Sequence, residues 1–201
     1  MIAIIDYDAG NLKSVEKALS YIGEEGKITR DRDEILAADK VILPGVGAFG
    51  DAMGKLRDFG LDKTIYDVVD KKTPFLGICL GLQLMFESSE ESEGVAGLGL
   101  LPGKIVRIPD AEGLKIPHMG WNSIEIKPES MLFNGIASGA YVYFVHSYYL
   151  QAKNMEDVAA VTDYSVRIHA AVEHDNIFAC QFHPEKSSDT GLHILKNFAA
   201  L

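Results

Sequence analysis

The sequence predicts a single-domain mixed α/β fold, with a sheet that is parallel at its centre, antiparallel towards an edge and flanked by helices. In the first half, short apolar runs alternate with helical patterns, which indicates a parallel sheet with helices on its faces. In the second half, strand-like runs follow one another, which favours antiparallel pairing. The 201 residues suit one large domain, since a domain averages about 150 residues. We therefore expect one domain over residues 1–201.

Three strands, each followed by helical patterns, are expected in the first half. The strands are Ile2–Ile5, Val41–Leu43 and Phe75–Ile78, and the helices cover residues 12–22, 50–57, 62–69 and 80–86. The first helix is predicted from apolar residues that recur at helical spacing from Leu12 to Ile22, with Asn11 before them as its N-cap.

The second half contains six expected strands, a hairpin turn and a closing helix. The strands are Lys104–Ile108, Ser123–Ile126, Tyr141–Leu150, Val158–Val161, Arg167–Glu173 and Ile177–Phe182. Residues 174–176 form the turn between the last two strands, and residues 190–200 form the helix. We interpret the acidic run from Glu87 to Gly94 as a solvated loop.

Charge and composition exclude several kinds of partner. There are 19 Lys plus Arg against 29 Asp plus Glu, a net charge of −10. An acidic chain lacks the basic stripe that nucleic acid or an anionic membrane requires. The longest uncharged apolar stretch, residues 73–86, is shorter than the ~20 residues of a membrane helix. With two cysteines and no signal peptide, we expect a reducing, cytoplasmic location.

The strongest chemical signal is the run GICLG at residues 77–81. It has the form of a strand-to-helix nucleophile elbow, with Cys79 in place of serine. Such a turn strains the backbone, and the glycines two positions before and after Cys79 let strand and helix approach each other. The turn also places the sulfur at a helix N-terminus, which favours the thiolate. Taken alone, the motif would also suit a buried strand cysteine.

A candidate base and its orienting carboxylate follow the last strand. Cys180 alternates in phase with two phenylalanines, so we expect it in the core. His183 falls on the opposite face, Pro184 makes it extended, and Glu185 then lies on the same side. A carboxylate beside an imidazole fixes its tautomer and raises its basicity. His183 alone would suit a surface histidine, but together with Cys79 it predicts a catalytic triad.

Several motifs resemble those of a known enzyme family. The runs GICLGLQ (77–83) and FHPE (182–185) resemble the two signatures of the class I, or triad, glutamine amidotransferases. Three more runs, PGVGAFG (44–50), PHMGWN (117–122) and HPEKSS (183–188), resemble the glutaminase subunits of imidazole glycerol phosphate synthase, from histidine biosynthesis. The resemblance covers essentially the whole chain and departs at no triad position. It implies a class I glutamine amidotransferase-like sheet with a flavodoxin-like core.

The resemblance implies a glutaminase that uses Cys79, His183 and Glu185. The Cys79 thiolate would attack the glutamine carboxamide and form a glutamyl thioester, while His183 would move the protons and Glu185 would orient it. The oxyanion donors would be the backbone N–H groups of Leu80 and Gly47. The substrate-binding residues would be Gly45, Gln83, Glu91, Ser147 and Tyr148.

The resemblance also implies a partner. No phosphate loop, dinucleotide fingerprint or metal-ligand spacing is present, so we expect no cofactor and no metal. The chain holds no domain for an ammonia acceptor. The expected partner is therefore the family's cyclase subunit, a (β/α)8 barrel, which would form a heterodimer with this chain and receive ammonia through a protected channel. The interface candidates are Asn11, Met119, Trp121 and Lys186, with burial in the core as the alternative for Trp121.

Two other functions share parts of this pattern. One is the glutaminase subunit of another triad amidotransferase, such as pyridoxal phosphate synthase, which would share the sheet and the triad. The runs 117–122 and 45–47 favour the first interpretation. The other is a non-catalytic binding module with the same fold, which the intact Cys79, His183 and Glu185 disfavour.

Overall fold

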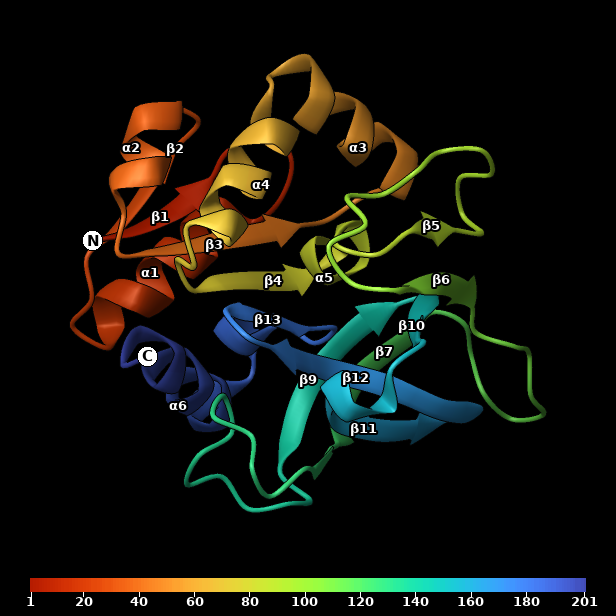
Figure 1. The fold of residues 1–201 in the computed structure, drawn as a ribbon. Coiled ribbons are helices and arrows are strands. Elements are labelled where there is room, and N and C mark those ends of the chain that lie inside the picture. The colour runs from red at the N-terminus through yellow and green to blue at the C-terminus, as the bar shows by residue number, and fades with distance from the viewer.

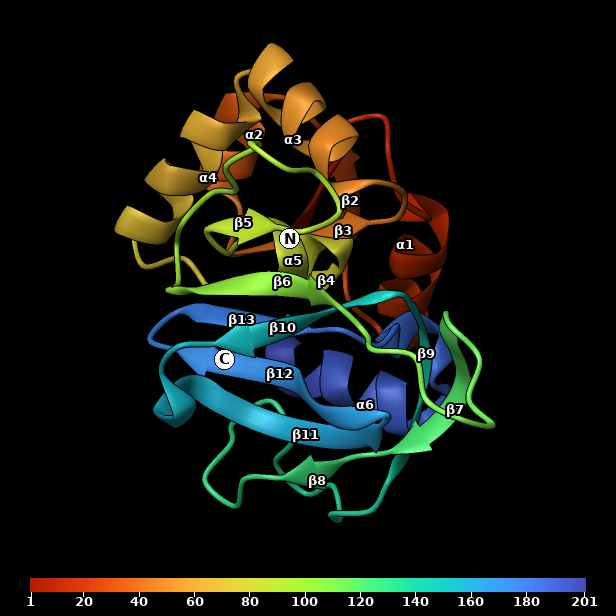
Figure 2. The same cartoon turned by 90° about the vertical axis from the view of Figure 1, so that its right-hand side faces the viewer.

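A sheet of eleven strands crosses the molecule, and a two-stranded sheet lies beside it (Figures 1 and 2). The structure is a computed structural model that describes residues 1–201. The strands of the large sheet are β1 (Ile2–Ile5), β2 (Gly26–Thr29), β3 (Lys40–Gly45), β4 (Phe75–Cys79), β5 (Ser88–Ser89), β6 (Gly103–Arg107), β8 (Glu125–Ile126), β10 (Tyr148–Ala152), β11 (Val158–Tyr164), β12 (Val166–His174) and β13 (Ile177–Cys180). The small sheet pairs β7 (His118–Ser123) with β9 (Tyr141–His146).

The large sheet changes from parallel to antiparallel pairing at β13. Strands β2, β1, β3, β4 and β13 lie side by side in that order, and each neighbouring pair is parallel. From β13 the sheet continues through β12, β10 and β6 with antiparallel pairs. Strand β5 then pairs in parallel with β6, and β11 and β8 extend the sheet beside β12. The predicted mixed α/β fold is confirmed, and its antiparallel part lies towards one edge.

Helices cover both faces of the parallel part of the sheet. They are α1 (Leu12–Tyr21), α2 (Arg32–Ala37), α3 (Phe49–Asp58), α4 (Leu61–Asp70), α5 (Leu80–Leu84) and α6 (Ser188–Ala199), with two 3-10 helices, η1 (Met155–Asp157) and η2 (Pro184–Lys186). Helices α2, α3 and α4 lie on one face, and α1 and α6 lie on the other (Figure 1). None of these helices combines the length and the apolar character that crossing a membrane requires.

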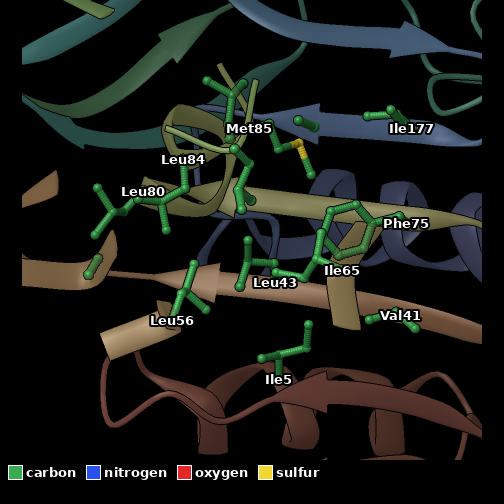
Figure 3. Packing of buried hydrophobic residues seen from close by; sticks show 14 of the residues in the cluster. Ile5, Val41, Leu43, Leu56, Ile65, Phe75, Leu80, Leu84, Met85 and Ile177 are labelled. Carbon is green, nitrogen blue, oxygen red and sulfur yellow. The ribbon is translucent and has the colours of Figure 1, made fainter. Parts of the chain in front are cut away.

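Successive side chains of the parallel strands point to opposite faces of the sheet, so apolar side chains form a hydrophobic core on each face. In β1, Ile5 belongs to the cluster with α2, α3 and α4, whereas Ile4 belongs to the cluster with α1 and α6. Figure 3 shows the first cluster, in which Ile5 lies near Leu43 of β3 and Leu56 of α3. Cys180 of β13 is fully buried in the second cluster, as the sequence predicts.

The single strand expected over Tyr141–Leu150 is in fact two strands that belong to different sheets. Strand β9 pairs with β7 in the small sheet, and β10 pairs with β6 and β12 in the large one. The chain changes sheets at Ser147, and the apolar pattern runs through the break without a signal. The strand expected over Ser123–Ile126 is likewise divided between β7 and β8.

Other differences lie at the ends of elements and at the sheet edge. Strand β2 and helix α2 are additional to the expected elements. Asp31 is the N-cap residue of α2, and its carboxylate accepts a hydrogen bond from Glu34 N at 3.0 Å. Aspartate is a favoured N-cap residue, so Asp31 is a sequence signal for this helix. Helix α5 ends at residue 84 rather than 86. Asn11 occupies the N-cap position of α1, but its side chain makes no capping hydrogen bond.

The turn from β4 to α5 leaves no room for side chains beside Cys79. A Cβ atom on Gly81 would lie 1.8 Å from the Leu43 carbonyl oxygen, and one on Gly77 would lie 2.9 Å from the Gly81 carbonyl group. Cys79 itself has φ 55° and ψ −109°, a strained conformation for a residue with a side chain. The close contact of α5 with β3 therefore requires glycine at position 81, and the protein stores strain at Cys79.

We predict that Gly81→Ala strongly destabilises the protein. The Leu43 carbonyl belongs to a buried strand and cannot rotate away, so α5 would have to move off β3. The free energy of unfolding, measured with urea, should fall by more than ~4 kcal/mol. Gly54→Ala is the matched control, because a Cβ atom at this position in α3 meets no atom within 4 Å and alanine favours a helix. Unchanged stability of Gly81→Ala would contradict the prediction.

Candidate active site

Three parallel strands end together at one edge of the large sheet. In the register of β3, β4 and β13, Gly45 lies opposite Cys79, and Cys180 lies one position earlier. Beyond β13 the chain continues through Gln181 to His183. The carboxyl ends of parallel strands form the edge at which α/β sheets bind ligands. The fold therefore gathers the motif residues at a typical binding position.

The Cys79 sulfur lies at this edge, and the residue is 7% exposed. The Gln181 side-chain amide donates to Sγ at 3.7 Å, and the Val145 carbonyl oxygen lies 4.0 Å from the sulfur. A nitrogen donor aimed at the sulfur stabilises a thiolate. Sequence reasoning gives Gln181 no role, although its position on the same strand face as His183 is a signal that would have pointed to it.

His183 and Glu185 form a buried pair. His183 Nδ1 donates to Glu185 Oε1 at 2.8 Å, and both side chains are 2% exposed. His183 Nε2 is buried and has no hydrogen-bond partner. Burial lowers the pKa of His183, but Cys79 and Glu185 outweigh this effect and raise the pKa to about 10. The expected extended segment after His183 is instead η2, and this 3-10 turn brings the carboxylate back to the ring.

Ser187 fixes the backbone of His183 against strand β9. Ser187 Oγ donates to the His183 carbonyl oxygen at 2.6 Å and accepts from Tyr143 N at 2.9 Å. His183 N also donates to the Tyr143 carbonyl oxygen at 2.9 Å. Ser187 is fully buried. Sequence reasoning missed this residue, because its partner on β9 lies 44 residues away and nothing local indicates it.

A cavity of about 400 Å³ opens at this edge, within the ~300–1,000 Å³ range of small-molecule sites. Most of the site residues expected from the sequence line it. These are Cys79 and His183, Gly47 and Leu80, and Gln83, Glu91, Ser147 and Tyr148. Glu185 lies behind His183. Gly45 does not line the cavity, because it packs beneath the elbow, where a Cβ atom would lie 2.4 Å from the Tyr7 hydroxyl oxygen.

The acidic run is a largely exposed loop around the short strand β5, as the sequence predicts, with Glu87, Glu90 and Glu93 at the surface. Three of its carboxylates are nevertheless held in place by hydrogen bonds. Glu87, Glu90 and Glu91 each accept a backbone N–H from a distant segment. Glu91 Oε2 accepts from Phe49 N at 2.8 Å, at the start of α3, where backbone donors lack partners within the helix. This bond holds Glu91 at the cavity wall, where it is the only acidic lining residue.

The Gln83 amide is fixed from two sides. Its Nε2 donates to the Tyr148 carbonyl oxygen at 3.1 Å and to Gln181 Oε1 at 3.0 Å, and the residue is 5% exposed. Its Oε1 has no hydrogen-bond partner in the protein, so an acceptor remains on a residue that lines the cavity. Gln83 and Gln181 together connect Tyr148 to the sulfur of Cys79. No group of three or more His, Cys, Asp and Glu side chains is placed to hold a metal ion.

The interface candidates lie on the surface. Met119 and Trp121 of β7 are 62% and 53% exposed, so burial of Trp121 in the core is wrong. Tyr141 of β9 is 60% exposed, and strand alternation places it on the same face of the small sheet. We call Met119, Trp121 and Tyr141 the β7–β9 patch. Asn11 and Lys186 are also exposed.

Comparisons with known proteins identify the class. Residues 3–201 match the family model described as class-I glutamine amidotransferase. The chain is 52% identical to the protein named imidazole glycerol phosphate synthase subunit HisH of Caldanaerobacter subterraneus subsp. tengcongensis, over 100% of this chain and 98% of that protein. The protein of the same name from Methanocaldococcus jannaschii is 48% identical, with 100% of both chains covered. A crystal structure described as glutamine amidotransferase has a TM-score of 0.77 at 19% identity, over 99% of this chain and 100% of that one, which shows the shared fold.

The chain therefore belongs to the class I glutamine amidotransferase family. Within that class it belongs with the imidazole glycerol phosphate synthase subunits named HisH, because relatives of that name match its whole length at about half identity. The resemblance seen in the sequence motifs is confirmed.

Two further histidines, His118 and His146, are buried beside the cavity, at 3% and 6% exposure. Burial is the main reason why the pKa of His118 is lowered to about 4 and that of His146 to about 3. An unfolded histidine binds a proton below about pH 6.5, whereas these folded ones stay neutral well below it. Folding stability is therefore lost as the pH falls below about 6.5.

We predict that the free energy of unfolding falls by about 2 kcal/mol per buried histidine between pH 7 and pH 5. Urea titrations at the two pH values measure this loss, and NMR of the imidazole protons should show no titration of His118 or His146 above pH 5. The matched control is His193→Gln, which replaces an exposed histidine of α6 and leaves the two buried rings in place. Titration of either buried ring near pH 6.5 would contradict the prediction.

Proposed function

We propose that residues 1–201 form a glutaminase domain that hydrolyses glutamine and passes the ammonia to a cyclase subunit, which makes imidazole glycerol phosphate and aminoimidazole carboxamide ribotide. One observation carries the chemical part of this proposal. A strained cysteine, a histidine with a free buried Nε2 and a carboxylate on that histidine's Nδ1 converge at one cavity. The names of the close relatives support the pathway and the partner.

In the proposed mechanism, the high proton affinity of His183 draws the proton from the Cys79 thiol. The thiolate attacks the carboxamide carbon of glutamine and gives a tetrahedral oxyanion. The carbon–nitrogen bond then breaks, and His183 gives the leaving ammonia its proton. Water next attacks the thioester while His183 takes one of its protons, the carbon–sulfur bond breaks, and glutamate leaves. Glu185 holds His183 with Nε2 towards the cavity throughout.

The oxyanion needs backbone donors at the elbow. Leu80 is the first residue of α5, so its N–H has no partner within the helix. Gly47 lines the other side of the cavity, in a loop that follows β3. Its φ of 103° is a conformation that glycine adopts without strain. We propose these two N–H groups as the oxyanion donors.

Charge complementarity supports glutamine as the substrate. Glu91 would bind the α-ammonium group, since it is the only acidic residue lining the cavity. Ser147 and Tyr148 lie on the lining as well and would meet the α-carboxylate side. The free Oε1 of Gln83 would accept from the carboxamide. Gly45 would act indirectly, because it packs under Leu80.

The β7–β9 patch is the proposed docking surface for the cyclase barrel. It presents three large apolar side chains to solvent beside the cavity, since Val145 of β9 also lines the cavity. Aromatic anchors of this kind often dominate binding energy at interfaces. Asn11 and Lys186 would contribute polar contacts around the patch. Ammonia released at Cys79 would then enter the partner without crossing bulk solvent.

The alternative is the glutaminase subunit of another triad amidotransferase, such as pyridoxal phosphate synthase. The fold and the triad would be the same, so only the partner separates the two. Glutamine turnover by the purified chain should rise with the cyclase and its acceptor, a phosphoribulosyl formimino carboxamide ribotide. A rise with the pyridoxal phosphate synthase subunit instead would favour the alternative.

We predict that Cys79→Ala, in complex with the cyclase, lowers glutamate release at least ~10³-fold, because no other thiol lines the cavity with His183. Synthesis from added ammonia should continue, since the partner's site is untouched. Cys180→Ala is the matched control, because it removes the cysteine that lies in the core and should keep most of the activity. Substantial glutaminase activity of Cys79→Ala would contradict the mechanism.

We predict that Trp121→Ala weakens the complex with the cyclase by about 30-fold, the effect of losing ~2 kcal/mol at an interface anchor. Isothermal titration calorimetry of the two subunits measures this change. The control is Met155→Ala on η1, which removes a side chain that is 61% exposed but lies outside the β7–β9 patch. Equal dissociation constants for the two variants would show that the patch is not the docking surface.

A further inference from the structure

Two buried histidines connect strand β7 to the wall of the cavity. His118 begins β7 and His146 ends β9, and the two residues lie opposite each other in the small sheet. His118 Nδ1 and His146 Nε2 are 2.9 Å apart. The His118 ring is stacked between Phe144, at 4.6 Å between ring centroids, and Tyr164, at 4.0 Å. This stacking and the burial hold both rings in place.

The hydrogen-bond partners define where each proton lies. His146 Nδ1 is 2.9 Å from the Tyr148 carbonyl oxygen, which can only accept, so Nδ1 carries the hydrogen. His146 Nε2 is then the acceptor, and His118 Nδ1 must donate to it. His118 Nε2 in turn accepts from Asn122 Nδ2 at 3.3 Å. Both rings are therefore neutral Nδ1–H tautomers, in agreement with the lowered pKa of each.

This series of bonds ends at the corner where the chain leaves β9 for β10. The Tyr148 carbonyl oxygen accepts from His146 on one side and from Gln83 on the other, at 3.1 Å. Ser147, which forms the corner, lines the cavity together with these three residues. The corner is thus held between a side chain of β9 and a side chain of the helix that follows Cys79.

We infer that His146, held by His118, is a positioning residue for glutamine: it fixes the Ser147–Tyr148 corner against Gln83 so that the cavity fits the substrate's backbone end. The inference rests on the proposed glutaminase function. His146 donates to a backbone carbonyl and takes no part in the bonds that form and break. Its loss therefore affects the binding of glutamine and spares the chemistry at Cys79.

The test compares two replacements of His146 in the complex with the cyclase. An asparagine amide can take the place of Nδ1–H and donate to the Tyr148 carbonyl, whereas leucine cannot. His146→Leu should raise KM for glutamine about tenfold with kcat within about threefold of the unaltered complex, and His146→Asn should restore KM to within about threefold. When each change is combined with Cys79→Ala, calorimetry should show the same tenfold loss of glutamine affinity for His146→Leu and no such loss for His146→Asn.

His169→Leu is the matched control. His169 also contacts β10 through one ring nitrogen, since its Nδ1 accepts from Ala152 N at 3.0 Å, but it does not line the cavity. KM should stay unchanged in this variant. Equal KM values for His146→Leu and the unaltered complex, or a fall in kcat at constant KM, would overturn the inference.

Two further results keep the inference separate from folding and from the proposed function. Nitrogen-15 NMR of the unaltered protein should show His118 and His146 as neutral Nδ1–H tautomers, and an Nε2–H tautomer at His146 overturns the inference even if His146→Leu fails to fold. If the unaltered complex does not hydrolyse glutamine, the proposed function fails, whatever the histidine variants do.

Discussion

The close approach of α5 to β3 determines the geometry of the whole site. Because Gly81 lies against the Leu43 carbonyl, the chain must turn from β4 into α5 at a single residue, and Cys79 takes the strained backbone conformation. The side chain then lies at the carboxyl edge of the sheet, where it lines the cavity. Strand β4 pairs in parallel with β3 on one side and with β13 on the other. This pairing brings the Gly47 loop after β3 and His183 after β13 to the same edge. The proposed triad, the proposed oxyanion loop and the cavity therefore all depend on one glycine contact.

Strand β9 reaches the site at two points. Near its middle, the Tyr143 carbonyl accepts from His183 N and the Tyr143 N–H donates to Ser187 Oγ. At its end, His146 donates to the Tyr148 carbonyl. The face of the small sheet opposite to His146 carries Trp121 and the rest of the β7–β9 patch. A partner bound to this proposed docking surface would thus contact a strand that reaches both His183, the proposed proton carrier, and the proposed substrate end of the cavity.

Local patterns predicted much of this arrangement, and long-range contacts account for what they missed. Glycines around Cys79 and the proximity of Glu185 to His183 are short-range features, so the sequence alone indicated them. The division of residues 141–150 between two sheets depends on which strand pairs with which, and an apolar run is compatible with either sheet. The position of Glu91 at the cavity wall cannot be read from its neighbours in the sequence, because its partner, the Phe49 N–H at the start of α3, lies 42 residues away.

Burial lowers the pKa of both His183 and His146, but the net shifts of the two neighbouring histidines are opposite because their partners differ. His183 faces a carboxylate and a thiol, so its positive form is favoured in spite of burial. His146 faces a carbonyl and a neutral ring, and the charge on His183 lowers its pKa further. Protonating His146 would place a second cation beside the first and break the bond it accepts from His118. The cavity can therefore hold a positive charge next to Cys79 and a negative one at Glu91 while His146 stays neutral, and this arrangement matches a substrate with an uncharged amide at one end and an ammonium group at the other.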